Sequence, residues 1–432
     1  MDLNKLKTKY RLSDLEIFSQ NSSQKKISFS ANKLKEAESS YSTGLAVRLI
    51  CDKKIGFASS YGNTSPDDLI QNALVNTKYS EEFDITLPSD ISQNSGTTVS
   101  KENPNELEQF EKTGNEIIEK ISKEADCLID ISFDLHTTSV KIENTRGLSC
   151  LNQKDLYSMF INIRETTEKD FIEIHTGFID SKNKLSNFSK YLNNILSFYH
   201  FSKKHAKPKN GSYSVLFTSK ASKELLNIIE LALNGKQVIQ KASPWHNKPG
   251  ERVLSKLITI RQDPGFGYMA REIDDEGSLV KPLVLINKGV LENFYFDLVT
   301  ACRSDCPVTP TAGNGFKPSL SSPPEPALLN MIISPGKRLL EEIIKDIDYG
   351  LLIDQTMGGL TANISGDFSV NVELGFLIEK GEITGRVKDT MISGNIYTAL
   401  NNVIELSKNC EFFFSNIYSP DMLLDGFIIT GK

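Results

Sequence analysis

A short polar segment near the middle of the chain separates two regions with different hydrophobic patterns. Residues 203–211 read Lys-Lys-His-Ala-Lys-Pro-Lys-Asn-Gly, which combines charge with a proline and a glycine. Because proline lacks a backbone N–H group and glycine loses much conformational freedom on folding, neither favours the interior of a helix or a strand. The segment therefore predicts a domain boundary, with residues 1–205 and 206–432 on either side. A solvated linker explains its lysines best, and a contact with an anion or a nucleic acid is the alternative.

The first region combines the alternating pattern of strands with apolar spacing typical of helices. Ser65 and Pro66 are a typical N-cap residue and first helical residue, respectively. Strands are expected at residues 15–18, 26–31, 43–50, 55–59, 127–138, 141–144 and 156–165, and helices at 65–79, 104–125 and 184–202. Residues 87–105 are rich in Ser, Thr, Asn, Asp and Pro, which predicts a long surface loop. We expect an N-terminal domain with a mixed or antiparallel sheet and flanking helices.

The second region has shorter strands separated by turn signals such as Asp263-Pro264-Gly265. A buried strand at 213–218 precedes a helix at 219–233, for which Ser219 is the expected N-cap and Gly235 the C′ residue. Further strands are expected at 283–286, 368–372 and 375–378, and a further helix at 337–346. This pattern predicts a β-rich, antiparallel, barrel-like C-terminal domain. The whole chain is therefore expected to be an α+β protein.

The composition argues against several classes of protein. A formal net charge of −6 does not favour binding to nucleic acid, which usually needs a basic surface. The sequence contains no run of about 18 or more apolar residues that would span a membrane. Residues 1–11 lack the apolar core of a secretory signal. Of the six cysteines, only Cys302 and Cys306 lie close together in the sequence, so reduced thiols and a cytoplasmic location are expected.

The sequence offers no confident catalytic set. A zinc peptidase motif needs two histidines and a glutamate on one helix, but no histidine of this chain is followed by glutamate; the five are His136, His175, His200, His205 and His246. A nucleophile elbow of the G-x-S-x-G type is also absent. The acidic run Asp274-Asp275-Glu276 has the charge to bind a cation, but the following Gly277 favours a polar turn. We therefore predict no catalytic residues, no metal ligands and no cofactor.

Several strings in the second region resemble segments of the TldD/PmbA family, in the same order. Residues 271–277, Arg-Glu-Ile-Asp-Asp-Glu-Gly, are similar to that family's R-x-x-D-D-E-G stretch. The densest similarity runs through Gly366-Asp367-Phe368 and residues 375–383 to 392–395. Weaker similarity covers residues 250–255, 258–260, 263–264, 287–291, 297–301 and 313–315. The chain resembles the TldE/PmbA branch of this family most.

This resemblance implies a cytoplasmic metallopeptidase system with two related subunits. The TldD-type subunit carries the zinc motif H-E-x-x-x-H on the first helix of its second domain, which corresponds to residues 219–233 here. The alignment places Asn227, Ile228 and Ala232 where His, Glu and His would stand, and residues 219–233 contain no histidine. The family's cysteine ligand is not carried over to Cys410, because the sequence around Cys410 differs.

We therefore expect a TldE/PmbA-like subunit that is not catalytic by itself. It would form a heterodimer with a TldD-like metallopeptidase, which would hold the zinc, and would help to bind an unfolded peptide. The alternatives are a non-enzymatic binding or regulatory homodimer of the type called modulator of DNA gyrase, and an independent hydrolase without a metal. The candidate groove or interface residues are Asp274, Asp275, Glu276, Gly366, Asp367 and Phe368. A purely structural β-turn is the alternative for Gly366-Asp367-Phe368.

Overall fold

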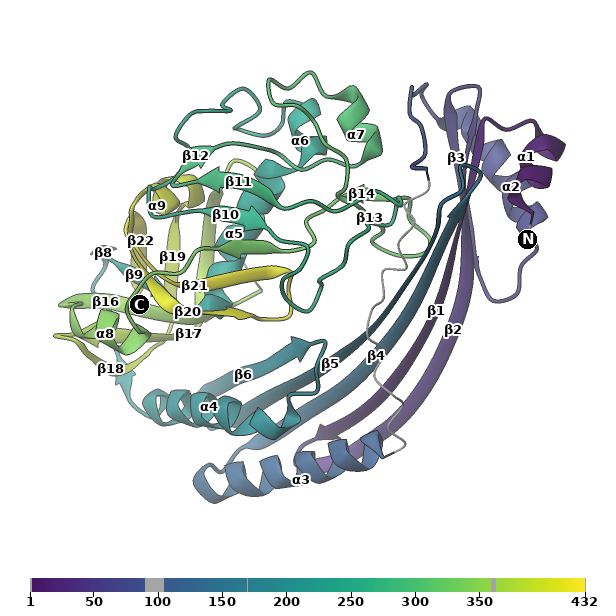
Figure 1. The fold of residues 1–432 in the computed structure, drawn as a ribbon. Helices are drawn as coiled ribbons and strands as arrows, with labels where there is room; N and C mark the ends of the chain where they lie inside the picture. Colours follow the sequence, from purple (N-terminus) through teal and green to yellow (C-terminus); the bar gives the residue numbers. More distant parts are fainter. Residues whose placement is uncertain (1, 90–104, 169, 359–362, 432) are drawn as a thin grey trace.

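Two large sheets dominate the structure, a computed structural model that describes residues 2–89, 105–168, 170–358 and 363–431 (Figure 1). The first, which we call the curved sheet, has the strand order β3-β2-β1-β4-β5-β6 and is antiparallel throughout. Its strands are β1 (Asp14–Ser30), β2 (Lys33–Cys51), β3 (Lys54–Tyr61), β4 (Leu128–Asn144), β5 (Ser149–Thr166) and β6 (Phe171–Asp180). The concave side of this sheet faces the C-terminal part of the chain.

The strands of the curved sheet are longer than the sequence predicted. The predicted segments 15–18 and 26–31 fall at the two ends of β1, which ends at Ser30, and segments 127–138 and 141–144 fall in β4, which begins at Leu128. The polar middle of β1 does not end the strand, because both neighbours pair with it there: Gln20 lies opposite Gly44 on one side and Val140 on the other. Ladder pairing on both sides therefore outweighs the low strand propensity of these residues. The predicted loop 87–105 lies largely outside the described residues.

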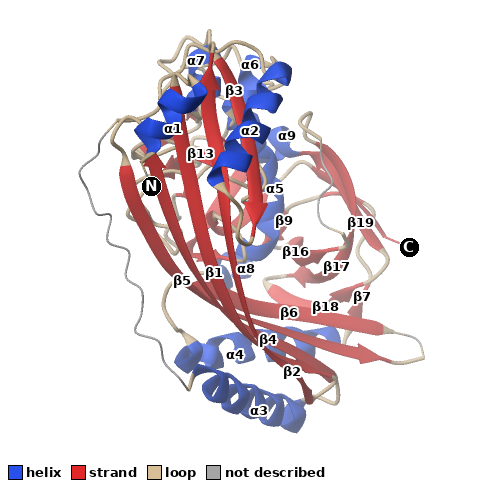
Figure 2. Cartoon of the chain, turned by 90° about the vertical axis from the view of Figure 1, so that its right-hand side faces the viewer, coloured by secondary structure: helices blue, strands red, loops and turns tan. Residues whose placement is uncertain are grey.

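Helices cover both ends of the curved sheet. Helices α1 (Leu3–Tyr10) and α2 (Pro66–Asn76) lie at one end, and α3 (Glu106–Glu124) and α4 (Phe188–Ser202) lie side by side at the other (Figures 1 and 2). Helix α1 was not predicted, and its N-cap is Asp2, which accepts a hydrogen bond from the backbone of Lys5. Ser65 does occupy the N-cap position of α2, but its side chain makes no capping hydrogen bond. The predicted end of that helix, residues 77–79, is a 3₁₀ turn.

The second sheet, which we call the C-terminal sheet, follows the order β12-β11-β10-β15-β21-β9-β16-β17-β19-β22-β8, with β7, β18 and β20 paired at its side. Its strands are β7 (His205–Ala206), β8 (Gly211–Ser212), β9 (Val215–Phe217), β10 (Ile260–Gln262), β11 (Leu283–Asn287), β12 (Val290–Leu291), β15 (Met331–Ile333), β16 (Tyr349–Thr356), β17 (Asp367–Glu379), β18 (Glu382–Val387), β19 (Thr390–Asn395), β20 (Val403–Phe412), β21 (Ile417–Leu424) and β22 (Phe427–Gly431). Most pairs are antiparallel, and β15–β21, β16–β9 and β18–β7 are parallel. The predicted α+β class is confirmed.

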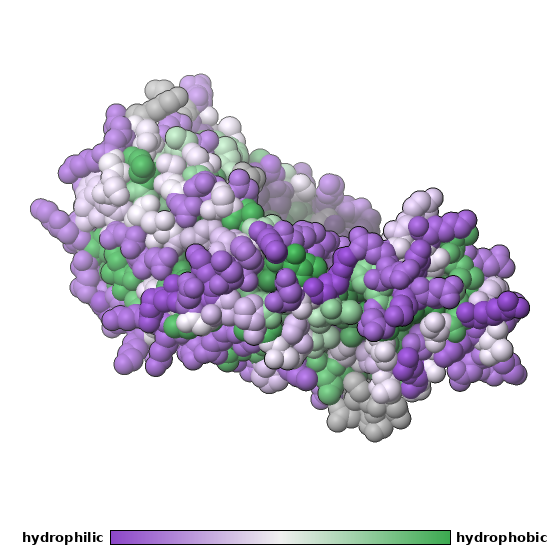
Figure 3. All heavy atoms as spheres, turned by 90° about the horizontal axis from the view of Figure 1, so that it is seen from above, coloured by the Kyte–Doolittle hydropathy of each residue, from purple (hydrophilic) through white to green (hydrophobic). Residues whose placement is uncertain are grey.

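The remaining elements surround the C-terminal sheet. They are the short ribbon of β13 (Gly315–Phe316) and β14 (Glu325–Pro326), and the helices α5 (Ser219–Leu233), α6 (Gly235–Ile239), α7 (Leu298–Arg303), α8 (Leu340–Lys345) and α9 (Ile396–Asn401). None of the described helices is long and apolar enough to cross a membrane. Seen from above, hydrophilic side chains cover most of the surface, and hydrophobic side chains form only small patches there (Figure 3).

Two local predictions around α5 were wrong. The N-cap is Thr218, whose Oγ1 accepts from the backbone N–H of Ala221, and not Ser219. Gly235 does not close α5, because Asn234 leaves the helix in an extended conformation and Gly235 begins α6. A Cβ atom at position 235 would overlap the ring of Phe296, so close packing accounts for this glycine. The polar segment 203–211 is mostly exposed, yet it supplies β7 and β8 to the C-terminal sheet.

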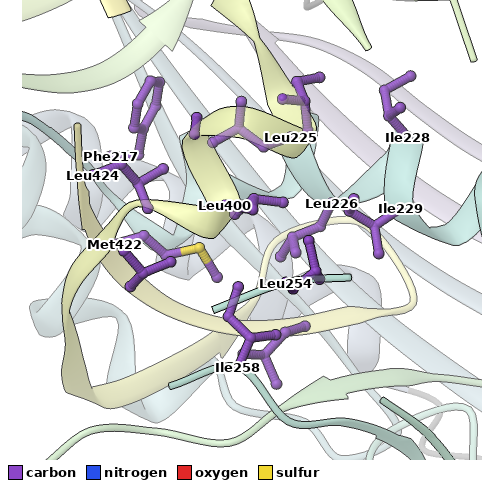
Figure 4. Packing of buried hydrophobic residues seen from close by; sticks show 14 of the residues in the cluster. Phe217, Leu225, Leu226, Ile228, Ile229, Leu254, Ile258, Leu400, Met422 and Leu424 are labelled. Atoms are coloured by element: carbon purple, nitrogen blue, oxygen red, sulfur yellow. The ribbon is translucent and has the colours of Figure 1, made fainter. Parts of the chain in front are cut away.

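The apolar core is continuous between the two sheets. Helix α5 lies in the largest cluster of buried residues, which includes Phe217, Leu225, Leu226, Ile229, Leu254, Ile258, Leu400, Met422 and Leu424 (Figure 4). A second cluster combines residues of the curved sheet, such as Phe133, with residues of the C-terminal sheet, such as Phe376. The ring of Phe376 contacts those of Phe198 and Phe201 in α4, at centroid distances of 5.4 and 6.1 Å. Because the cluster crosses the boundary, the two sheets should unfold together.

Replacing Phe376 with alanine should lower the free energy of unfolding by about 3–5 kcal/mol, because it empties a fully buried site. Urea denaturation followed by circular dichroism and by the fluorescence of Trp245, the single tryptophan, should give coincident transitions. Phe171→Ala is the matched control, since Phe171 is 50% exposed. Two separate transitions would show that the sheets unfold independently.

Candidate functional site

The acidic run Asp274-Asp275-Glu276 forms a buried turn, not an exposed cluster. Asp274 and Glu276 are each 1% exposed and Asp275 is 8% exposed. Asp274 closes the turn, because its Oδ1 accepts from the backbone N–H groups of Glu276 and Ser278 at 3.0 and 2.8 Å, and its Oδ2 accepts from that of Gly315 at 2.9 Å. A Cβ atom at Gly315 would overlap the carboxylate of Glu276. The glycine turn at 313–315 therefore lets the chain approach the acidic run closely.

An arginine from the curved sheet binds this turn. Arg48 of β2 donates from Nη1 to Glu276 Oε1 at 2.5 Å, and from Nε and Nη2 to the carboxylate of Glu16 in β1 at 3.0 and 3.1 Å. Arg48 is 5% exposed and Glu16 is 3% exposed. The other oxygen of Glu276 accepts from the backbone N–H of Leu298 at the start of α7. We call this group the ionic junction: Glu16, Arg48, Asp274, Asp275 and Glu276.

The ionic junction holds four carboxyl groups around Arg48, and Arg271 supplies a second guanidinium, whose Nη2 lies 3.0 Å from Asp275 Oδ1. Burial raises the pKa of Glu276 to about 7, although the positive charge of Arg48 opposes the shift. Burial, and then the negative charge of Glu276, also raise the pKa of Asp274 well above its usual value. The junction can therefore retain a proton on a carboxyl group near neutral pH. Since its carboxylates bind an arginine and backbone donors, it has the character of a structural ion-pair network.

Residues of helix α5 at the zinc-motif positions carry no suitable ligands. Asn227 is exposed, whereas Ile228 is 6% exposed and the side chain of Ala232 is fully buried. Ile228 lies in the apolar cluster around α5 (Figure 4), and neither it nor Ala232 has an atom that binds zinc. The residues present therefore do not fit a zinc ion. Within the described residues, no group of three or more His, Cys, Asp and Glu side chains is arranged to hold a metal.

The other predicted group, Gly366-Asp367-Phe368, lies at the start of β17 and contacts different partners. Gly366 has φ +84°, and a Cβ atom there would approach Tyr397 to 2.7 Å. Asp367 is exposed and accepts from Asn395 Nδ2 at 2.8 Å and Ser365 Oγ at 3.0 Å, contacts that lower its pKa. Phe368 is 8% exposed and packs edge-on against Phe427. The structure thus places the acidic run at the curved sheet and this turn beside α9.

Several important charged residues were not identified from the sequence. Arg48 and Glu276 are 228 positions apart, and no local pattern marks either as a partner. Lys220 of α5 is a second case: its ammonium group lies 2.5 Å from Asp354 and donates to the His175 carbonyl at 2.8 Å and to Gln355 Oε1 at 2.9 Å. Lys220 thereby connects α5 with both sheets. Asp354 lies in β16, next to a run of apolar residues. A carboxylate in such a strand was the sequence signal that could have indicated a buried cationic partner.

The surroundings of His175 suit a structural role. Its ring packs between Phe160 and Phe413, at centroid distances of 5.5 and 5.8 Å. Burial, together with the positive charges of Lys220 and Lys223, lowers the pKa of His175 to about 3. The ring is therefore neutral at physiological pH.

Family models match both parts of the chain. A model described as the PmbA/TldA metallopeptidase C-terminal domain matches residues 210–431, and one described as domain 1 of the same metallopeptidase matches residues 15–77. The chain belongs to the PmbA/TldD metallopeptidase family. The resemblance seen in the sequence is confirmed. A relative described as a metalloprotease, from Methanocaldococcus jannaschii, is 32% identical over 176 residues, which are 40% of this chain and 38% of that protein's length.

Solved structures of similar proteins show the same fold. TldE from Thermococcus kodakarensis gives a TM-score of 0.87 at 23% identity, with 99% of this chain and 98% of that chain covered. A Thermotoga maritima protein named for a proposed modulation of DNA gyrase gives a TM-score of 0.86 at 19% identity, with the same coverage. These likenesses show that the chain shares the fold of these solved structures over 99% of its length.

Replacing Arg48 with methionine should destabilise the protein by about 3–5 kcal/mol, because it leaves Glu16 and Glu276 buried without their partner. The loss should be smaller at about pH 5 than at about pH 8, since carboxyl groups with raised pKa values are neutralised as the pH falls. Urea denaturation at the two pH values measures both effects.

The matched control is Arg261→Met, which removes a guanidinium that is 40% exposed and paired with Asp263. Exposed pairs contribute about 0–1 kcal/mol, so this variant should remain close to the wild type. If Arg48→Met is as stable as Arg261→Met, the ionic junction does not stabilise the fold.

Proposed function

We propose that the chain is a non-catalytic, TldE/PmbA-like subunit of a TldD/TldE-type metallopeptidase system that acts on unfolded peptides. The observation that carries the proposal is the composition of helix α5. A catalytic zinc site needs about three protein ligands and an open position for water. At the motif positions this chain has Asn227, Ile228 and Ala232, of which the last two are buried apolar residues. Peptide cleavage would therefore depend on the zinc of a TldD-like partner in a heterodimer.

The edge of the curved sheet supports a role in binding an extended peptide. Residues Lys33–Thr43 of β2 pair with β1, whereas β3 pairs only with the part of β2 from Gly44 onward. Among the described strands, this part of β2 therefore has one unpaired edge. Its residues 33–42 are all exposed. An exposed strand edge presents backbone N–H and C=O groups to which an extended peptide can add as a further strand.

A second candidate function is a non-enzymatic binding or regulatory homodimer. It is favoured by the structural likeness to the Thermotoga maritima protein named for DNA gyrase modulation. The same unpaired edge of β2 would then meet a second copy of the chain. A net charge of −6 does not favour direct binding to DNA. In either case we infer a cytoplasmic location, which suits free buried thiols such as Cys127 and Cys150.

The purified chain alone should contain no stoichiometric zinc and should leave unfolded peptides intact, because α5 supplies no zinc ligand. Addition of a TldD-like subunit with an intact H-E-x-x-x-H motif should produce cleavage that a chelator abolishes. Elemental analysis and a peptide-cleavage assay measure the two effects.

The matched control is the same mixture with a TldD-like subunit whose motif glutamate is replaced by glutamine. Chelator-sensitive cleavage by this chain alone would refute the proposed division of labour. Stable self-association without any effect on the partner's activity would instead support the regulatory homodimer.

The Gly366-Asp367-Phe368 turn provides a test of the predicted partner interface. If the turn contacts the partner, Asp367→Ala should weaken association, while the melting temperature stays close to that of the wild type because Asp367 is exposed. Asn395→Ala is the positive control for loss of local structure, since Asn395 donates to Asp367 and also caps α9 through the N–H groups of Tyr397 and Thr398. Loss of such a cap typically costs about 0.5–2 kcal/mol. Thermal melts and a pull-down on both variants measure these effects; a destabilised Asp367→Ala protein with normal association would leave the turn a structural role only.

A further inference from the structure

The unpaired edge of β2 begins with a short charged segment. Residues 33–38, which we call the edge segment, read Lys-Leu-Lys-Glu-Ala-Glu. Read backwards, the order of charged and apolar residues is the same with every sign reversed. All six residues are exposed, and among the described strands only β1 pairs with them, since β3 lies beside β2 only from Gly44 onward (Figure 1). The lysines and glutamates of the edge segment form no ion pair within the described part of the chain, so their charges are available to an incoming strand.

A β-bulge lies at the centre of the edge segment. Glu36 lies opposite Ser28 and Leu34 lies opposite Phe29, so Lys35 is the extra residue of β2. An extra residue of this kind interrupts the alternation of side chains between the two faces of a strand. In a regular strand Leu34 and Glu36 would share a face, whereas here they lie on opposite faces of the sheet.

The bulge sorts the side chains of the edge segment by their chemistry. Leu34 and Ala37 lie opposite buried apolar residues of β1 and share their face, against which α3 packs. Lys33, Glu36 and Glu38 lie opposite polar residues of β1 on the other face. A hydrogen bond with Glu36, and then its negative charge, raise the pKa of Glu38. The two carboxyl groups therefore lie close together, and cations opposite them would relieve their repulsion.

We propose that two copies of the chain associate through the edge segment, as an antiparallel strand pair with two-fold symmetry. Residue 33 would lie opposite residue 38 of the second copy, 34 opposite 37, and 35 opposite 36. This register places every lysine of the segment opposite a glutamate, and Leu34 opposite Ala37. Because of the bulge, residues 33 and 38 share one face of the sheet and residues 34 and 37 share the other, as directly opposite residues must.

The order of the charges favours this register over its neighbours. Moving one copy by one residue brings Lys35 opposite Lys35 of the second copy, and the reverse movement brings Glu36 opposite Glu36 of the second copy. Like charges directly opposite each other destabilise a strand pair. An unrelated strand would have to match both the charges and the bulge, so a second copy of the chain is the partner that this edge fits.

The interface formed by the edge segment is small. Standard stable interfaces contain about 20–30 residues per side, so a six-residue strand pair should give a weak dimer that forms only at high protein concentration. The dimer would cover part of the edge to which an extended peptide is assigned above, so a second copy and a peptide would compete for it. This competition rests on the proposed function, whereas the pairing itself does not.

Sedimentation velocity of the full chain at concentrations from about 5 to about 500 µM tests the pairing. The wild-type protein should form dimers at the higher concentrations, and added salt should weaken them by screening the charges. The double variants Lys33→Glu/Lys35→Glu and Glu36→Lys/Glu38→Lys should each self-associate about tenfold more weakly, because each places like charges opposite one another.

An equimolar mixture of the two double variants should form a heterodimer about as strongly as the wild type forms its dimer, since every lysine again lies opposite a glutamate. Both variants keep a negative net charge, so overall attraction does not explain such a recovery. The matched control is Lys256→Glu/Lys408→Glu, which changes the net charge as much as the first variant does, at exposed positions outside the curved sheet. This control should associate as the wild type does.

The proposal is overturned if the wild-type protein stays monomeric over the whole range, or if either double variant associates as strongly as the control. It is also overturned if the mixture fails to associate while both variants keep the circular dichroism spectrum of the wild type. Should a double variant fail to fold, Lys35→Glu and Glu36→Lys replace the pair, because these positions lie opposite each other at the centre of the register. None of these measurements uses a peptide or a metallopeptidase subunit, so failure here is distinct from failure of the proposed function.

Discussion

The guanidinium of Arg48 joins three segments that are far apart in the sequence. It binds Glu16 in β1 and Glu276 in the acidic turn, and the second oxygen of Glu276 binds the first residue of α7. The orientation of the curved sheet relative to the acidic turn therefore depends on this buried cation together with the apolar cluster that contains Phe18, Val140 and Ile273. Separating the sheet from the turn would leave Arg48 and Glu276 as buried charges without partners, which strongly opposes such a movement.

A second ionic contact, made by Lys220, also joins the curved sheet to the C-terminal sheet. Lys220 joins the first turn of α5 to Asp354 and Gln355 in β16 and to the carbonyl of His175 in β6. The shared apolar cluster lies between the curved sheet and the C-terminal sheet. The contacts of Lys220 and the apolar packing of α5 hold this helix in position, although it carries no zinc ligands. Its residues now serve packing, as the full burial of Ala232 and Leu226 shows.

The α+β class and the approximate positions of α3, α4 and α5 could be predicted from the sequence, because strong apolar periodicity marks buried helices. The length of β1 could not, because its polar middle is stabilised by neighbours that are distant in the sequence. The acidic run was interpreted from its composition as a polar turn with the charge to bind a cation, and from the family resemblance as a candidate groove or interface. Its burial depends on Arg48, however, and the pairing of residues 228 positions apart leaves no local signal.

The unpaired edge of β2 also determines how this protein avoids unwanted association. Over residues 33–38 the edge carries Lys33, Lys35, Glu36 and Glu38, so both signs of charge occur within a few positions. Charged side chains on an exposed edge discourage aggregation, because an incoming strand must match their order as well as the backbone spacing. Such an edge discriminates between strands by register and charge, and the exposed side chains of Leu34 and Tyr41 add two apolar contacts along it. Salt weakens this protection by screening the charges.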